Sequence, residues 1–233
     1  MSEASATIER QTYNDRLFSK GLRARLHLAR FYCVQQIAKA IPHDGVLELG
    51  CFDGRLLDYI KPARYVGLDA GWEGGIDNAI IRHGGDPSKT FIKTEDASEL
   101  SRFPARSFDL GVALETLEHM PDDSLEAYLE QMQRTCKRFL VTVPNEKGPV
   151  FLGKWMAKRL LLRETSSDRY TFGEVVNATL GRMDRVARRE HKGFDYAGLA
   201  RQLSRRFVIE KTVGLPWGPP YLAFSVGFLM TSR

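Results

Sequence analysis

Through residues 45–143, short apolar runs alternate with segments in which apolar residues have helical spacing. This pattern predicts short buried strands separated by helices. Each apolar run is followed by a turn signal and then by a segment with helical spacing. The strands are predicted at about residues 45–50, 65–69, 90–94, 108–114 and 139–143. Helices are predicted at about residues 54–61, 76–83 and 121–138. This alternation predicts an α/β fold in which a parallel sheet carries helices on both faces.

The pattern changes on both sides of this alternating core, which spans residues 41–147. Residues 8–40 have helical spacing and predict an N-terminal helical cap within residues 1–40. Residues 148–192 break the alternation and predict an inserted lid with helices at about 151–162 and 172–187. Residues 193–233 would complete the sheet with a helix at about 195–205 and strands at about 207–214 and 221–230.

The most informative stretch runs from Val46 to Gly54, where an apolar run ends in an acid and a turn with two glycines follows. Glycine lacks a Cβ, so a turn of this kind lets a ligand approach bare backbone at a helix start. Fifteen residues after Gly54, a second apolar run ends in Asp69. Strand, glycine turn, helix, strand and acid form the layout of a nucleoside-binding site at the edge of a parallel sheet.

The residues around the turn favour a cationic nucleoside over a dinucleotide. A pyrophosphate cradle uses G-x-G-x-x-G, and Phe52 stands where the second glycine would be. Glu48 and Asp53 would repel a diphosphate and attract a cation. S-adenosylmethionine, with its sulfonium and ammonium groups, is such a ligand. An NAD-dependent enzyme remains a rival, because NAD sites place an acid where Asp69 stands.

Five motifs resemble those of class I S-adenosylmethionine-dependent methyltransferases. They are Glu48–Gly54, Asp69, Glu95–Ala97, Ser107–Met120 and Val141–Asn145. Their order and spacing carry the resemblance over about residues 41–146. It implies a Rossmann-like, doubly wound sheet of seven strands that is mostly parallel, with an antiparallel last strand inserted between the fifth and the sixth.

The same resemblance implies roles for residues that would hold the cofactor. The turn with Gly50, Cys51 and Gly54 would lie against the methionine part, with Glu48 near its ammonium group. Asp69 would accept hydrogen bonds from both ribose hydroxyls, because a carboxylate has two acceptor oxygens.

Three further residues belong to the predicted cofactor site. Asp96 would receive the adenine amino group, and the backbone amide of Ala97 would reach a ring nitrogen. Asp96 could instead cap the following helix, as an Asp before Ser98 readily does. Glu115 follows the fourth strand, beside the expected position of the transferable methyl group.

Candidate residues for catalysis and substrate binding lie in the loop after the fourth strand and in the insert. Glu115 and His119 are the candidate catalytic residues. His119 could take a proton from a substrate hydroxyl, since its unperturbed pKa is near ~6.5, or it could pack beside the cofactor. The candidate substrate-binding residues are Trp155, Arg159, Arg188 and His191. No spacing of cysteine and histidine indicates a metal site.

Charge is distributed unevenly along the chain. The net charge is +5, yet residues 41–147 carry 12 basic and 19 acidic residues, a net charge of −7. Residues 148–192 carry 10 basic and 5 acidic residues, a net charge of +5. The acidic core suits a cationic cofactor. The basic flanks suit an acidic substrate, an anionic membrane surface or nucleic acid, and solvated helix faces would explain them equally well.

Cysteine usage and the chain start predict a cytoplasmic protein. Cys33, Cys51 and Cys136 are scattered and odd in number, which favours a reducing compartment. Residues 1–7 lack the basic start and apolar core of a signal peptide. No run reaches the ~18 apolar residues of a membrane helix.

Together these features predict an S-adenosylmethionine-dependent methyltransferase that acts on a small acidic or lipid- or sugar-linked metabolite, at an oxygen. Pro144-Asn145-Glu146 lacks the Asn/Asp-Pro-Pro-Tyr/Phe pattern associated with amino methylation, which argues against a nucleic-acid base as acceptor. Two alternatives remain: an RNA methyltransferase and a methyltransferase-like binding protein without catalytic activity.

Overall fold

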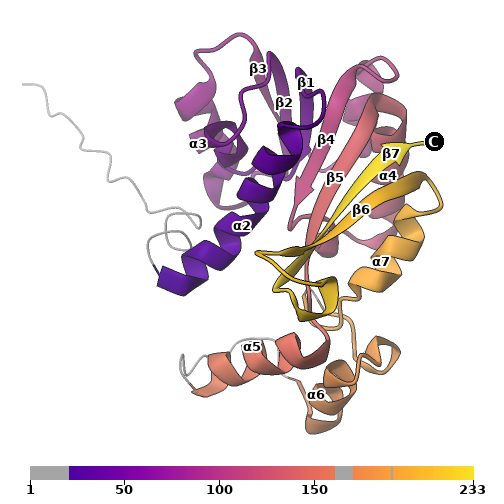
Figure 1. The fold of residues 1–233 in the computed structure, drawn as a ribbon. Helices are drawn as coiled ribbons and strands as arrows, with labels where there is room; N and C mark the ends of the chain where they lie inside the picture. Colours follow the sequence, from indigo (N-terminus) through magenta and orange to yellow (C-terminus); the bar gives the residue numbers. More distant parts are fainter. Residues whose placement is uncertain (1–20, 161–169, 190) are drawn as a thin grey trace, which may run out of the picture.

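A seven-stranded mixed sheet forms the centre of the molecule (Figure 1). The structure, a computed structural model, describes residues 21–160, 170–189 and 191–233. The strands are β1 (Gly45–Leu49), β2 (Arg64–Asp69), β3 (Lys89–Lys93), β4 (Phe108–Leu114), β5 (Cys136–Pro144), β6 (Phe207–Leu215) and β7 (Ser225–Ser232). Their order is β3-β2-β1-β4-β5-β7-β6, and β7 runs antiparallel to both of its neighbours. The predicted Rossmann-like fold with an inserted antiparallel last strand is confirmed.

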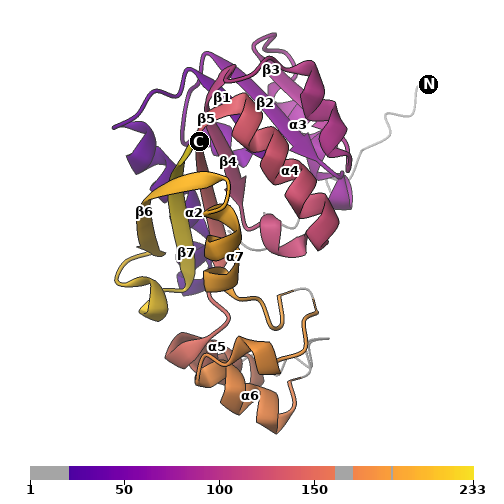
Figure 2. The same ribbon diagram turned by 90° about the vertical axis from the view of Figure 1, so that its right-hand side faces the viewer.

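Helices cover both faces of this sheet (Figures 1 and 2). The α-helices are α2 (Gly21–Ala38), α3 (Gly75–His83), α4 (Asp122–Thr135), α5 (Gly148–Leu160), α6 (Phe172–Thr179) and α7 (Tyr196–Leu203). Side chains alternate along β1, so Val46 packs in a core with α2 while Leu47 and Leu49 pack in a core with α4 and α7. Since both faces are buried, the strands lie between two apolar layers.

The first crossover differs from the helix predicted at 54–61. Only a 3₁₀ turn forms there, η1 (Arg55–Asp58). Pro62 follows after only a few residues and β2 begins at Arg64, so the segment is too short for a helix that could cover the sheet. Helix α2 covers that face instead, through Phe31, Val34 and Ala38. The part of the predicted N-terminal cap that lies in residues 1–20 is outside the described residues.

Other predicted boundaries shift for local reasons. The helix predicted to reach residue 138 ends at Thr135, because Cys136 begins an extended segment whose side chains are buried against β4 and β7. The helix predicted over 172–187 ends at Thr179, two residues before Gly181 takes a left-handed conformation with φ 76°. The last strand begins at Ser225 rather than 221, because a 3₁₀ turn occupies Pro220–Leu222.

The insert after β5 has a small core of its own. Helices α5 and α6 enclose five buried side chains, Phe151, Val175, Ala178, Met183 and Val186. Lys154 Nζ of the insert lies 2.5 Å from Glu146 Oε1, just after β5. Lys147 Nζ lies 2.5 Å from Asp195 Oδ1, so this ion pair joins the two segments that flank the insert. Figure 1 shows the insert beneath the sheet, at the edge where β5 ends. Within the described part of the chain, no helix is both long and apolar enough to cross a membrane.

Candidate active site

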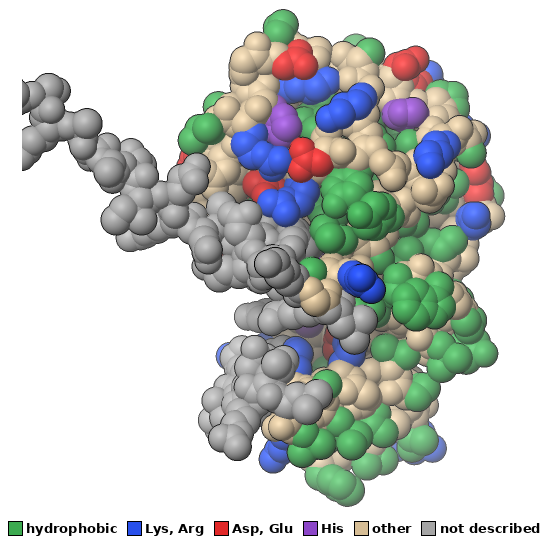
Figure 3. Space-filling view, turned by 60° about the vertical axis from the view of Figure 1, so that its left-hand side comes forward, with side chains coloured by type: hydrophobic (Ala, Val, Ile, Leu, Met, Phe, Trp, Pro, Cys, Tyr) green, Lys and Arg blue, Asp and Glu red, His purple; other side chains and the backbone are tan. Residues whose placement is uncertain are grey.

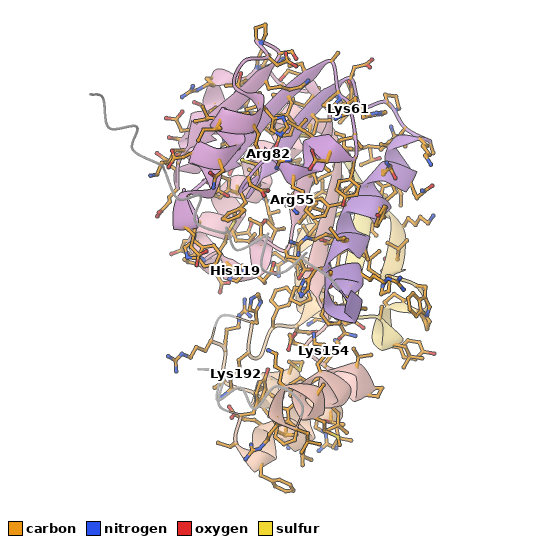
Figure 4. The ribbon with its side chains drawn as sticks, turned by 90° about the vertical axis from the view of Figure 1, so that its left-hand side faces the viewer. Arg55, Lys61, Arg82, His119, Lys154 and Lys192 are labelled. Carbon is orange, nitrogen blue, oxygen red and sulfur yellow. The ribbon has the colours of Figure 1, made fainter. Side chains whose placement is uncertain are left out.

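The carboxyl ends of the parallel strands meet at one edge of the sheet, and Figure 4 shows His119 near this edge, on the side that faces the insert. Gly50 follows β1, Asp69 ends β2 and Glu115 follows β4. Ligands of doubly wound sheets bind at this edge, because the loops there diverge on either side of the central strand. The topology therefore gathers residues that lie far apart in the sequence.

The turn after β1 is held by its own backbone and by Thr116. The amides of Gly50 and Cys51 both donate to Leu68 O, at 2.8 and 3.1 Å. Gly50 has φ 70°, and a Cβ there would overlap the side chain of Thr116. Glycine at this position therefore makes room for a side chain of the protein itself. The predicted approach of the cofactor to the backbone of this turn stays a prediction.

Asp69 is positioned to accept further hydrogen bonds from a ribose. Its Oδ2 accepts from the Phe52 amide at 2.9 Å and its Oδ1 accepts from the Gly71 amide at 2.7 Å. Each carboxylate oxygen has a second lone pair, so both oxygens keep acceptor capacity. The two backbone bonds fix the carboxylate between the turn after β1 and the loop after β2. The residues present thus fit a nucleoside diol, the predicted role of Asp69.

Two other acids of the turn are less negative than the sequence suggests. Asp53 is buried and forms ion pairs with Arg55 (3.2 Å) and Arg82 (3.8 Å), which offset its charge. Burial raises the pKa of Glu48 to about 8, although Tyr65 Oη donates a hydrogen bond to it at 2.5 Å. Neither acid therefore supplies the unpaired negative charge by which the sequence favoured a cationic cofactor.

Asp96 caps the 3₁₀ turn η3 (Ala97–Arg102), which was the alternative to its predicted adenine contact. Its Oδ1 accepts from the Ser98 amide at 2.8 Å, and Ser98 Oγ donates to Oδ2 at 2.6 Å. These bonds lower the pKa of the Asp96 carboxyl. Asp96 and the buried Ala97 also line an open groove of about 460 Å³ between η3 and α4. The adenine contacts of both residues stay a prediction.

An aromatic pair that was not among the predicted site residues lies near Asp69, whose carboxylate accepts from the Phe52 amide. Phe52 has φ 45° and its ring lies over Gly75, where a Cβ would overlap it. The ring of Trp72, which is largely exposed, has its centroid 6.1 Å from that of Phe52. The signal was present in the sequence: a bulky residue replaces a glycine in the turn while two glycines, Gly74 and Gly75, follow the tryptophan.

The loop after β4 and the end of the insert form the other side of the site. Glu115 has φ 55°, and its Oε1 is buried without a hydrogen-bond partner among the described residues. Glu118 is 1% exposed, and neither of its carboxylate oxygens has a hydrogen-bond partner there. The rings of His119 and His191 meet edge to face with centroids 4.3 Å apart. The sequence named Glu115, His119 and His191 but not Glu118 as site residues.

Burial and neighbouring charges change the proton affinity of this group. Desolvation, with smaller contributions from His191 and Arg188, lowers the pKa of His119 to about 4. Desolvation and the nearby Glu115 raise the pKa of Glu118 well above its ordinary value. His119 is thus neutral at pH 7, and it is a weaker proton acceptor than an unperturbed histidine.

Two of the four residues predicted to bind substrate contact residues of this rim. Arg188 donates from Nη2 to the backbone oxygen of Glu118 at 2.6 Å, and His191 packs on His119 as described. Trp155 and Arg159 contact each other on α5, with the guanidinium 5.3 Å from the ring centroid. Trp155 packs against the small core of the insert. The role of residues 148–192 as a lid or membrane contact stays a prediction.

Asn145, which follows β5 on the same edge, is a structural residue. It is fully buried, and its Nδ2 donates to Pro220 O at 3.2 Å and to Ala223 O at 3.0 Å. Its side chain therefore ties the end of β5 to the segment before β7.

Comparison with known proteins identifies the family. Residues 22–182, more than half of the chain, match the family described as "Methyltransferase domain". No curated protein gives a significant match.

Solved structures share the fold. The PH0226 protein from Pyrococcus horikoshii OT3 is 18% identical, with a TM-score of 0.62, and the match covers 95% of this chain and 97% of that one. A S-adenosylmethionine-dependent methyltransferase from Clostridium acetobutylicum ATCC 824 is 13% identical (TM-score 0.58; 93% and 96% covered). Magnesium protoporphyrin IX methyltransferase (ChlM) from Synechocystis PCC 6803, solved with bound S-adenosylhomocysteine (SAH), is 15% identical (TM-score 0.55; 94% and 92% covered).

The family match, the sheet order and the glycine turn with Asp69 agree with one another. The chain belongs to the methyltransferase-domain family and is a class I S-adenosylmethionine-dependent methyltransferase.

Proposed function

We propose that the enzyme transfers the methyl group of S-adenosylmethionine to an oxygen of a small acidic or lipid- or sugar-linked metabolite. The observation that carries this proposal is the rim formed by Glu118, His119, Arg188 and His191, where the loop after β4 meets the insert. It combines acceptor atoms that can bind a hydroxyl with a guanidinium that suits an anionic group. The three free cysteines fit a reducing cytoplasm, which we propose as its location.

On the donor side, this chain would hold the cofactor by a few fixed groups. Asp69 would bind the ribose, the turn from Gly50 to Gly54 would lie along the methionine part, and Glu48 would lie near the ammonium group. The bound cofactor supplies a methyl group on a sulfonium, which is already a good leaving group. What remains for the protein is to place the acceptor oxygen in line with the methyl carbon and the sulfur, and positioning of this kind supplies much of the acceleration.

On the acceptor side, the insert supports an anionic substrate. Residues 148–192 have a net charge of +5, and Arg188 stacks over the ring of Phe194 at 4.8 Å while it donates to Glu118 O. Figure 4 shows His119 on the edge of the sheet body that faces the insert, which carries Lys154 and Lys192. An acceptor bound between these parts would meet basic groups on one side and the loop after β4 on the other.

The proposal is tested by incubating the enzyme with methyl-labelled cofactor and fractionated small metabolites of the host. We expect label in a low-molecular-weight product that mass spectrometry identifies as a methyl ether or ester. Label recovered only in RNA would contradict the proposal. Binding of SAH without any turnover would instead indicate a binding protein.

A further inference from the structure

A compact group of potential metal ligands lies on the acceptor side of the site. Glu118, His119 and His191 each offer one ligand atom, and these atoms all lie within 4.8 Å of one another. Glu118 Oε1 and His191 Nδ1 lie 4.0 Å apart. Metal–ligand bonds of about 2.0–2.2 Å hold ligand atoms at most ~4.4 Å apart. A small rotation of side chains would therefore complete a coordination shell.

Two residues of this cluster, Glu118 and His191, have buried ligand atoms without a hydrogen-bond partner, whereas His119 is exposed. Both carboxylate oxygens of Glu118 and Nδ1 of His191 have no hydrogen-bond partner within the described ranges, and the same holds for Glu115 Oε1. Buried polar groups are normally hydrogen-bonded, and buried charges are normally paired or bound to metal. The unused bonding capacity of Glu118 and His191 thus converges on one place.

Two nearby arginines offset the negative charge of the Glu118 carboxylate. Arg30 and Arg188 both act electrostatically on Glu118. The hydrogen bond of Arg188, however, goes to the backbone oxygen of Glu118, which leaves the carboxylate oxygens available. His191 is 40% exposed, so an ion can reach the cluster from solvent.

From these contacts we propose that Glu118, His119 and His191 bind one divalent first-row transition-metal ion, with Glu115 as an additional ligand. Imidazole nitrogen together with carboxylate oxygen suits Mn²⁺, Fe²⁺ or Zn²⁺ better than Mg²⁺ or Ca²⁺, which prefer oxygen alone. Three or four protein ligands leave a coordination position open, as catalytic metal sites do. In this proposal the acceptor oxygen of the substrate occupies the open coordination position.

The chemical role of the ion rests on the proposed function. A hydroxyl bound to such an ion releases its proton to water more readily. The oxygen then forms the new bond to the methyl carbon, while the bond from that carbon to sulfur breaks and its electron pair stays on sulfur.

The test is metal binding by the full chain, free of cofactor and acceptor. After treatment with chelator and its removal, the protein is titrated with Mn²⁺ by electron paramagnetic resonance and with Zn²⁺ by calorimetry, with Mg²⁺ as the comparison ion. We expect one equivalent of Mn²⁺ or Zn²⁺ to bind, with Mg²⁺ at least about tenfold weaker. Glu118→Gln, His119→Gln and His191→Gln should each weaken binding by at least about tenfold.

Matched controls separate loss of the site from loss of the fold. His43→Gln, in the loop before β1 at the opposite end of the strand, should bind metal as the wild type does. SAH titration of every variant reports whether the cofactor side is intact. The proposal is wrong if the wild type shows no saturable binding, if Mg²⁺ binds as tightly as Mn²⁺, or if the cluster variants match His43→Gln. Metal binding without O-methylation of any metabolite would contradict the proposed function alone.

Discussion

At the scale of single residues, Asp69 joins two backbone segments and still has acceptor capacity for a ligand. Asp69→Ala should weaken SAH binding by about 1–3 kcal/mol, because hydrogen bonds to a charged acceptor are lost. Asp69→Asn keeps one acceptor oxygen and should show a smaller loss. Calorimetric titration measures both, with the exposed Asp86→Ala as control. An unchanged dissociation constant for Asp69→Ala would refute its role in cofactor binding.

Glu48 makes stability depend on pH in a direction that can be measured. Its pKa is about 8 in the folded protein, mainly because of burial, against an ordinary value of about 4.3 for glutamate. The folded state therefore binds a proton that the unfolded chain releases between these values. The resulting stability is fully present below about pH 4.3 and is lost as the pH rises towards about 8.

Glu48→Gln removes this titration. Relative to the variant, the free energy of unfolding of the wild type should fall by about 1.4 kcal/mol per pH unit within the window. Urea unfolding of the cofactor-free protein at pH 5, 6, 7 and 8 measures the difference. The exposed Glu130→Gln should follow the wild type at each pH. Parallel curves for the wild type and Glu48→Gln would show that Glu48 titrates normally.

At the scale of elements, helix α6 is fixed by a capping box that also fastens the end of the insert. Thr171 Oγ1 accepts from the Glu174 amide at 3.3 Å, and Glu174 Oε2 accepts from the Thr171 amide at 2.8 Å. Glu174 also pairs with Lys192, 2.8 Å away, directly beside His191. The cap thus connects the start of α6 to the segment that carries two residues of the acceptor rim.

Thr171→Ala should lower stability by about 1 kcal/mol, the usual cost of losing a cap. Thr171→Ser keeps the acceptor oxygen and is the matched control. Hydrogen exchange should show faster opening of Phe172–Thr179 in the alanine variant and little change in β1 and β4, because the insert has a separate core. Equal losses for serine and alanine would show that the hydroxyl does not cap the helix.

The existence and type of most elements could be predicted, whereas several details of the site could not. Strands β1 to β5 were predicted because each is a short apolar run, and tertiary contacts did not change this local preference for strand. The 3₁₀ turn at Arg55–Asp58 was missed because helical spacing alone does not reveal that α2 already covers that face. Three details depend on contacts between distant segments. They are the ion pair of Asp53 with Arg82, the Thr116 side chain at Gly50 and the convergence of Glu118 with His191.

At the scale of the whole molecule, several basic residues in the described part of the chain are paired with acids. Lys147, Lys154 and Lys192 each lie within 2.8 Å of a carboxylate oxygen. Figure 3 shows Lys and Arg side chains interspersed with Asp and Glu on the sheet body. Nucleic-acid binding depends on a continuous basic surface that releases counterions from phosphates.

We therefore expect no specific retention of RNA. Fluorescence anisotropy with a labelled RNA at about 50 mM and 200 mM salt is the measurement, since a true RNA-binding surface loses affinity steeply between these conditions. Saturable binding with a steep salt dependence would favour an RNA methyltransferase over the small-molecule enzyme proposed above.

Thr116 connects the turn after β1 to the loop after β4. Its side chain fills the space that Gly50 leaves, and Oγ1 lies 3.3 Å from Leu49 O and 3.2 Å from Leu114 O. Through these contacts the turn after β1, which would hold the methyl donor, packs directly against the loop that carries Glu115 and His119. His191 and Arg188 arrive on a separate piece whose core is its own. The acceptor side is thus built partly on a segment with its own core, so we expect substitutions there to change acceptor preference while the turn after β1 stays intact.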